Sequence, residues 1–315
     1  MRLGAHLPLV DLGGPRLSVS GLNAYARTVS DLGFRAIAAN DHLTFTRPWL
    51  DGIVALASVL PASGDLTLAT TAALPVIRRP VVLARAAAAL DELSAGRLLL
   101  GVAAGSSRAD YDLVGLDFDR RWVLFDEALT ELRRRVPDRP LWVASWGSPA
   151  GLRRVARWGD GWLASAYNTT PAEVVSARAL LRDERARLDL HGPELGCAVT
   201  TMWTRVTVRG AEQRATLEQL SGLLGRPQEV LAGQLLVGSP EHCAGLVRGY
   251  ARAGVDLLCL WPVGDPEREL ERFKTDVLPL LEDDAPTDGR PWPRPAGRSS
   301  GGPGAAPGPR PAGPH

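Results

Sequence analysis

Residues 80–102 read PVVLARAAAALDELSAGRLLLGV and contain one complete helix-to-strand unit. Pro80 stands where the first turn of a helix begins, the position at which proline is best tolerated. The apolar-rich stretch after it predicts a helix to about Leu93, and Gly96 lies just past the end, where glycine commonly stops a helix. Residues 98–102 are a short apolar run typical of a buried strand. This segment therefore predicts an α/β protein.

The same alternation continues in both directions along the chain. The strands we expect, nearly all separated by a helix, are residues 3–7, 35–39, 66–73, 98–102, 141–144, 161–165, 196–208 and 255–261. Helical crossovers between neighbouring strands require a parallel sheet with right-handed connections. Eight such units in about 280 residues favour a closed TIM (β/α)8 barrel, with an open doubly wound sheet as the alternative topology.

The composition of the 315-residue chain changes after Asp284. Residues 285–315 contain 9 prolines and 7 glycines and almost no aliphatic side chains. Such a segment cannot bury enough apolar area to offset its chain entropy. We therefore expect one barrel domain at residues 1–284 and a Pro/Gly-rich disordered tail at 285–315. A proline-rich ligand for a partner domain is the alternative for the tail.

The charge and cysteine content exclude several classes of partner. With 36 basic and 35 acidic residues the formal charge is +1, so there is no global electrostatic case for nucleic acid or an anionic membrane. The three cysteines are far apart and form no C-x-x-C, which fits a reducing cytosol better than a disulfide framework or a zinc site. No segment approaches the roughly 20 apolar residues that span a bilayer. We expect a cytoplasmic protein with a small-molecule substrate.

The sharpest polar pair follows the second predicted strand. In an α/β barrel the chemistry gathers at the carboxyl ends of the strands. His42 can move a proton near neutral pH there, and the adjacent Asp41 can orient it or pair with it. We take His42 and Asp41 as the catalytic candidates, although a histidine that only caps a loop is the competing interpretation. A metal site is not expected, because it needs several converging ligands and the chain has five histidines in all.

Small residues follow the third, fourth and fifth strands. Backbone N–H groups in such turns, and the positive end of a helix dipole, can hold an anion. The glycine turn at 101–105 is neither G-x-G-x-x-G nor G-x-x-x-x-G-K, so dinucleotide and P-loop sites are not indicated. The end of the third strand can form a bulge on which a flat ring rests its face. The candidate cofactor-binding residues are Thr70, Thr71, Ala72, Gly105, Ser106, Ser145, Trp146, Gly147 and Ser148.

Several motifs occur in a fixed order between residues 32 and 241. They are Leu32-Gly33-Phe34, Asn40-Asp41-His42-Leu43, LPVIRRPVVLA at 74–84, LDELSAGRLLLGV at 90–102, Asp110-Tyr111, Phe118, Arg121, Asp126-Glu127, Asp160-Gly161-Trp162 and Gly238-Ser239-Pro240-Glu241. In this order they resemble the luciferase-like flavin-dependent oxidoreductases, a family of eight-stranded barrels. The resemblance covers nearly all of residues 1–284.

The resemblance implies a non-covalent cofactor in the barrel mouth, with coenzyme F420 as the first choice and FMN as the second. It places a bulge with a non-proline cis peptide near Thr71 and Ala72, beneath the cofactor. It puts His42 beside the reactive ring and assigns residues 145–147, with the following helix start, to the phosphate. It also implies a homodimer formed through the side of the barrel that carries residues 81–90.

Two positions depart from the family pattern. Ser106 stands where relatives commonly have an aromatic residue, and where the sugar-phosphate-oxidising deazaflavin branch has an acidic one. Ser106 therefore argues against that activity. The link before the fifth strand is only residues 136–139, whereas relatives usually insert a few tens of residues there to cover the pocket. We expect a pocket that is more open, or that a neighbouring subunit closes.

Three hypotheses for function follow. The first is a deazaflavin-dependent oxidoreductase that moves a hydride between coenzyme F420 and a small organic substrate, with His42 handling the proton. The second is an FMN-dependent monooxygenase that uses O2 and receives reduced flavin from a separate flavin reductase. The third is a flavin-binding protein without catalysis.

Overall fold

Eight parallel strands close into a barrel in the computed structural model, which describes residues 1–10 and 17–284. The predicted tail at 285–315 therefore lies outside the described residues. Each strand pairs with its neighbours in parallel register, and the pairing of β6 with β7 closes the ring. The closed barrel is confirmed over the open sheet. Its strands are β1 (Arg2–His6), β2 (Ala36–Ala39), β3 (Thr67–Thr70), β4 (Leu98–Val102), β5 (Leu141–Ala144), β6 (Gly161–Ser165), β7 (Gly196–Val206) and β9 (Leu257–Pro262).

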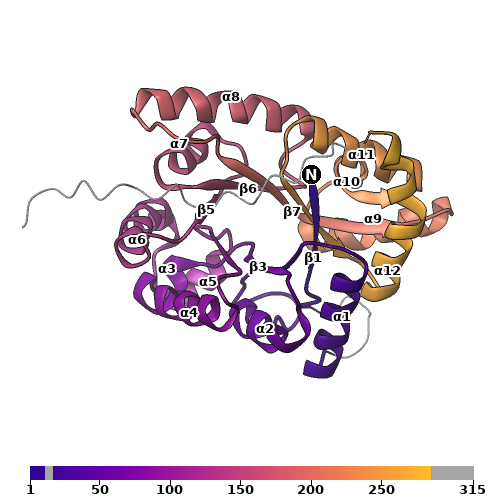
Figure 1. Ribbon diagram of the computed structural model, residues 1–315, viewed down its shortest axis with the longest axis horizontal. Coiled ribbons are helices and arrows are strands. Elements are labelled where there is room, and N and C mark those ends of the chain that lie inside the picture. Colours follow the sequence, from indigo (N-terminus) through magenta and orange to yellow (C-terminus); the bar gives the residue numbers. More distant parts are fainter. Residues whose placement is uncertain (11–16, 285–315) are drawn as a thin grey trace, which may run out of the picture.

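Figure 1 shows the helices following one another around the strands in chain order. They are α1 (Val19–Asp31), α2 (Gly52–Ser58), α3 (Pro75–Arg78), α4 (Pro80–Leu93), α5 (Arg108–Leu113), α6 (Arg121–Arg135), α7 (Pro149–Trp158), α8 (Pro171–Arg187), α9 (Gly210–Leu224), α10 (Gln228–Gln234), α11 (Pro240–Arg252) and α12 (Pro266–Arg272). Short 3-10 turns occur at Leu60–Ala62, Phe118–Arg120 and Leu278–Asp284, and a π turn at Phe273–Val277. No helix in the described ranges is long and apolar enough to cross a membrane.

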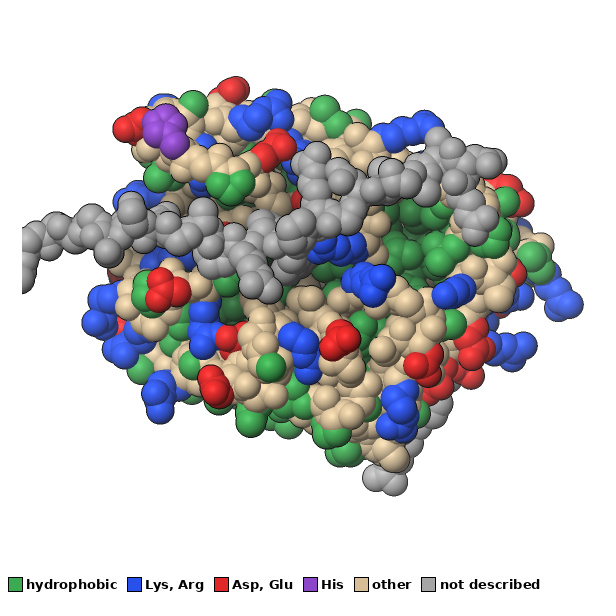
Figure 2. All heavy atoms as spheres, viewed as in Figure 1, with side chains coloured by type: hydrophobic (Ala, Val, Ile, Leu, Met, Phe, Trp, Pro, Cys, Tyr) green, Lys and Arg blue, Asp and Glu red, His purple; other side chains and the backbone are tan. Residues whose placement is uncertain are grey.

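Local signals explain most helix starts. Pro80 opens α4 as predicted, and Thr170 and Glu173 cap α8 reciprocally. The first helix begins at Val19 because the Ser18 side chain accepts the N–H of Gly21. The short link before the fifth strand is confirmed, since α6 ends at Arg135 and β5 begins at Leu141. Figure 2 shows positive and negative side chains interspersed on one face of the molecule.

The seventh strand contains an irregularity that matters for the site. Its pairing with β9 shifts register between Val199 and Met202, and Thr201 in between has a φ of 55°. The residues after this bulge pair with β8 (Leu236–Gly238), a ninth strand that the sequence did not predict. Three residues are too few for a recognisable strand pattern.

Side chains inside the lower barrel form a separate packed cluster that includes Ala38, Leu99, Trp142, Leu163 and Cys259. Trp142 fits because its neighbour is Gly161, where a Cβ would lie 2.3 Å from the indole ring. This packing fills the barrel from below. A ligand site must therefore lie above it, at the carboxyl ends of the strands.

Candidate active site

An aromatic stack crosses three adjacent strands at the barrel mouth. Trp261 of β9 lies between His6 of β1, at 3.9 Å between ring centroids, and Trp203 of β7, at 4.2 Å. Trp203 and Trp261 are register partners on neighbouring strands, so their side chains share one face. Without the bulge at Thr201, Met202 would take the inward position instead, because one extra residue reverses the facing of everything after it.

His6 is fully buried, and its Nε2 lies 2.9 Å from the hydroxyl oxygen of Thr71. Burial lowers the pKa of His6 to about 3, against a smaller opposing effect from the backbone of Leu7. The imidazole is therefore neutral at physiological pH. Sequence reasoning identified Trp261 as a strand end but missed His6 and Trp203, because neither belongs to a polar motif.

His42 is held by a carboxylate that is distant in sequence. Its Nδ1 lies 3.3 Å from Oδ2 of Asp110, in the first turn of α5. Asp110 also accepts hydrogen bonds from the backbone N–H of Thr44 at 2.7 Å and from the Thr44 hydroxyl at 2.6 Å. Burial alone would raise the pKa of Asp110, but the hydrogen bonds from His42 and Thr44 outweigh it and lower that pKa. An ionised Asp110 accepts the Nδ1–H of His42 and leaves Nε2 for a ligand.

The expected pairing of Asp41 with His42 is wrong. Asp41 is buried and accepts from Nε and Nη2 of Arg78 at 2.6 and 2.7 Å, and from the N–H of Leu74 at 3.2 Å. Adjacent residues at a strand end leave the backbone in opposite directions, so they do not face one another. Asp41 ties the end of β2 to α3, and Asp110 has the position beside the histidine.

The end of β3 has the form that the resemblance implied. The peptide bond between Thr71 and Ala72 is cis, and Ala73 resumes the pairing with a bridge to Val102. The Thr70 hydroxyl donates to the carbonyl of Gly101 and accepts its N–H, each at 2.8 Å. Because the hydroxyls of both Thr70 and Thr71 are engaged within the protein, this segment offers a ligand mainly its backbone and the Ala72 methyl.

The loop after β4 turns at Gly105, whose φ is +88°, and packs beside Leu74. Ser106 is exposed there. Ser107 accepts the N–H of Asp110 at 3.2 Å and so caps α5. The loop thus starts the short helix that presents Asp110 to His42.

The turn after β5 leads into the amino end of α7. The Ser145 hydroxyl accepts the N–H of Gly147, which has a φ of +90°, and Ser148 caps the helix by accepting the N–H of Gly151. A Cβ at Gly151 would lie 2.3 Å from the Ser145 hydroxyl, so only glycine lets the helix start approach this closely. Trp146 is exposed beside it. The turn combines the positive helix end with small residues, as an anion site requires.

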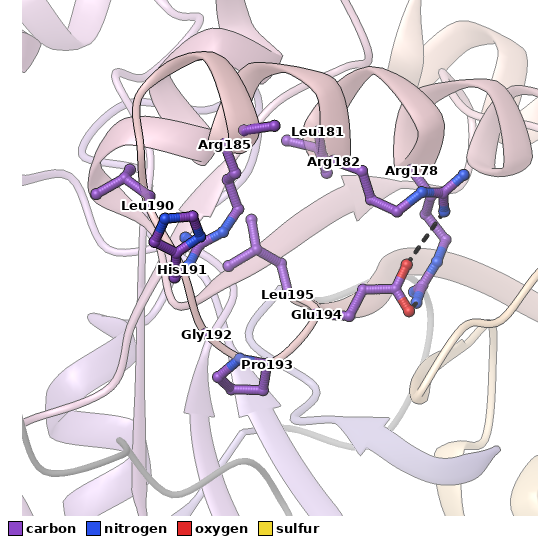
Figure 3. Close-up of a pocket in the computed structure, with 11 residues that line it drawn as sticks. Arg178, Leu181, Arg182, Arg185, Leu190, His191, Gly192, Pro193, Glu194 and Leu195 are labelled. Carbon is purple, nitrogen blue, oxygen red and sulfur yellow. Dashed lines mark hydrogen bonds and ion pairs between the residues drawn. The ribbon is translucent and has the colours of Figure 1, made fainter.

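A hollow of about 280 Å³ lies elsewhere, between the end of α8 and the start of β7. In Figure 3, Arg178 and Arg182 extend toward Glu194, which pairs with both. This hollow is at the amino end of a barrel strand, the face associated with stability rather than catalysis. We therefore place the active site at the mouth. Across the described residues, no group of three His, Cys, Asp or Glu side chains is arranged to hold a metal ion.

Comparison with known proteins agrees with this geometry. The luciferase-like monooxygenase family matches residues 8–136. This part of the chain is therefore similar to the luciferase-like family. The chain is 26% identical to the F420-dependent hydroxymycolic acid dehydrogenase of Mycobacterium tuberculosis, over 82% of this chain and 84% of the relative. It is 25% identical to the F420-dependent glucose-6-phosphate dehydrogenase of Kribbella flavida, over 85% and 95%.

Solved structures show the same fold. An F420-dependent secondary alcohol dehydrogenase, in complex with an F420-acetone adduct, superposes on this chain with a TM-score of 0.74 and 16% identity, covering 88% of this chain and 98% of that one. A monooxygenase from Streptomyces bottropensis gives a TM-score of 0.72 at 20% identity, covering 89% and 100%.

Proposed function

We propose that this protein is a coenzyme F420-dependent oxidoreductase that transfers a hydride between the cofactor and a small organic substrate. The observation that carries the proposal is His42 held through Nδ1 by the buried carboxylate of Asp110 at the barrel mouth. Relatives named as F420-dependent dehydrogenases, which match more than four fifths of the chain, support the choice of cofactor.

The residues at the mouth fit such a cofactor. The turn at Ser145, Gly147 and Ser148 would hold its phosphate, and the backbone at Thr71 and Ala72 would support the flat ring. The buried side-chain oxygen of Asn40, at the end of β2, has no hydrogen-bond partner within the described ranges, as expected where a polar ring system binds. When bound, F420 supplies the site that accepts or donates the hydride.

The protein's own contribution is to position and move a proton. Because Asp110 accepts the Nδ1–H of His42, Nε2 carries the lone pair that can take up the proton of a substrate hydroxyl. In the opposite direction, a protonated Nε2 returns the proton to a carbonyl oxygen. Asp41 acts as a positioning residue, since its bond to Arg78 fixes the loop that begins with His42.

Two other functions remain for comparison. A monooxygenase from Streptomyces bottropensis and an FMN-bound Baeyer–Villiger monooxygenase from Pseudomonas putida share the fold, which keeps the FMN-dependent monooxygenase with a separate flavin reductase as the second candidate. That function predicts turnover that requires O2. A non-catalytic flavin-binding protein is the third and predicts binding without turnover.

The His42→Ala variant tests the catalytic proposal. Positioned general acid–base groups contribute about 10² to 10⁴ in rate, so we expect turnover to fall by that factor while the Kd for F420 stays unchanged. Turnover is followed from the change in cofactor absorbance under argon. His191→Ala, at an exposed position on the opposite end of the barrel, is the matched control. Wild-type turnover in His42→Ala with F420 still bound would contradict the assignment.

A further inference from the structure

Four rings at the mouth, His6, Trp49, Trp203 and Trp261, form what we call the aromatic wall. The edge of Trp49 packs against Trp261 at 5.8 Å between ring centroids, and Trp49 also lies 4.9 Å from the ring of His42. The Trp49 backbone is fixed by a bridge to Val10. Through Trp49, the aromatic wall therefore contacts His42, the proposed proton-transfer residue.

Two indole N–H groups in the aromatic wall are buried without a partner in the part of the chain that the structure describes. Nε1 of Trp49 and Nε1 of Trp203 make no hydrogen bond to any described residue. By contrast, Nε1 of Trp162, on the outside of the barrel, donates to the Ser145 carbonyl at 2.9 Å. A buried indole N–H normally finds an acceptor, because leaving it without a hydrogen bond in the folded protein is unfavourable. The two orphaned donors therefore point to an acceptor atom on a ligand.

The ionised carboxylate of Asp110, beside His42, disfavours an anionic substrate near these donors. Apart from Arg205, which lies two residues after Trp203 and pairs with Glu212 and Glu269, the interior positions at the carboxyl ends of the described barrel strands include no Lys, Arg, Asp or Glu; they are His6, Asn40, Thr71, Ala103, Ala144, Ser165, Trp203 and Trp261. His6 is neutral because burial lowers its pKa. The positive charge of the nearby Arg78 is more than balanced by its two partners, Asp41 and Asp51. Burying a phosphate or carboxylate against such a surface is costly.

We propose that the aromatic wall is the substrate subsite and binds an uncharged, planar ring compound whose carbonyl or hydroxyl oxygen accepts a hydrogen bond from the indole N–H of Trp203 or Trp49. Trp49, the partly exposed ring of the aromatic wall, supplies stacking area, and the N–H groups select for the oxygen. The proximity of Trp49 to His42 brings such an oxygen within reach of the proton-transfer residue. The role of the aromatic wall in turnover rests on the proposed function, whereas binding of the ring compound to the aromatic wall does not.

The test compares two probes of similar shape, 2-acetylnaphthalene and 2-isopropylnaphthalene, by calorimetric titration of the full chain with and without F420. We expect the ketone to bind more tightly than the hydrocarbon. Trp203→Phe and Trp49→Phe keep an aromatic ring and delete the N–H. Each should weaken ketone binding by about tenfold and leave hydrocarbon binding unchanged. Trp158→Phe, at the end of α7 beside Arg157, is the matched control and should change neither.

The outcomes separate this inference from the proposed function. If the ketone binds with the expected variant effects but F420 does not bind, the cofactor proposal fails and the subsite stands. If F420 binds and both tryptophan variants keep wild-type ketone affinity, or the two probes bind equally, the subsite is wrong. Tighter binding of glucose 6-phosphate than of the ketone would also overturn it. The unfolding midpoint of each variant shows whether it is folded. One folded tryptophan variant is sufficient for the test.

Discussion

At the scale of single residues, the site depends on the contact between His42 and Asp110. The polar pair after the second strand predicted His42, but its partner comes from 68 residues further along the chain. Local spacing cannot reveal such a contact, because the loop after β4 must first fold back across the mouth. Ser107 was the available signal, since a serine three residues before an acidic residue starts a helix and fixes where that carboxylate lies.

The Asp110→Asn variant should lose stability in a pH-dependent way. The pKa of Asp110 is lower in the folded protein than its ordinary value, so its contribution is present at neutral pH and is lost as pH falls through the folded pKa. At pH 7 we expect the free energy of unfolding to drop by about 1–3 kcal/mol relative to wild type. The difference should shrink below about pH 4, where the wild-type carboxylate starts to protonate.

Urea unfolding at several pH values between about pH 3 and pH 7 measures this difference in the free energy of unfolding. The control is Asp119→Asn, which removes an exposed carboxylate that pairs with an exposed arginine, Arg108. Such exposed ion pairs contribute little to the free energy of unfolding. A constant difference between Asp110→Asn and wild type across the whole range would contradict the role given to Asp110.

At the scale of elements, the regular strands were predictable and the irregular ones were not. The predicted 98–102, 141–144 and 161–165 agree with β4, β5 and β6 in both bounds. The bulge at Thr201 has no sequence signal, because a β-branched residue is a poor candidate for a positive φ. Yet this bulge turns Trp203 inward, so the aromatic wall could not be predicted from the sequence.

The packing of α12 against the end of β7 creates a buried acid. Glu269 accepts the N–H of Val206 at 2.5 Å and lies 3.4 Å from Arg205. Burial is the largest cause that raises the pKa of Glu269 to about 7; Val206, Arg205 and Arg272 oppose it, and Glu212 adds to it. The folded state therefore holds this proton more tightly than the unfolded chain, whose Glu pKa is about 4.3.

Glu269→Gln should consequently flatten the pH dependence of stability. The stabilising proton of Glu269 is fully present below the unfolded pKa and is lost as pH rises through the folded value of about 7. As pH rises between these limits, the free energy of unfolding of the variant should increase relative to wild type by up to about 1.4 kcal/mol per pH unit. Urea unfolding measures this difference. Glu271 is exposed on the same helix, so the free energy of unfolding of Glu271→Gln should depend on pH in the same way as that of wild type. An equal slope for Glu269→Gln would refute the buried-acid explanation.

At the scale of the whole molecule, the order of strands and helices was enough to predict the barrel. Repeated αβ units leave few topologies open, and about 280 residues is the size of one barrel. The oligomeric state cannot be predicted in the same way, because it depends on surface residues that the repeating pattern of strands and helices does not constrain. The helices α2 and α4 pack against one another and expose Val54 and Val82, at 67% and 61%.

We propose that this face forms a homodimer. Sedimentation equilibrium should then give twice the chain mass of 33.6 kDa. Val82→Asp places a charge on the exposed face without disturbing the core, so we expect it to shift the mass toward one chain. Val175→Asp, on the exposed side of α8, is the control and should leave the dimer intact. A wild-type mass of one chain would remove the proposal.

The measurement that tests the central claim most directly is a titration of the purified chain with F420 and with FMN, in separate anaerobic experiments followed by absorbance. We predict saturable binding of F420 that is tighter than binding of FMN, and weaker F420 binding in Gly147→Val, because a positive φ at that position keeps the phosphate turn in place. Tight binding of FMN together with no binding of F420 would contradict the account.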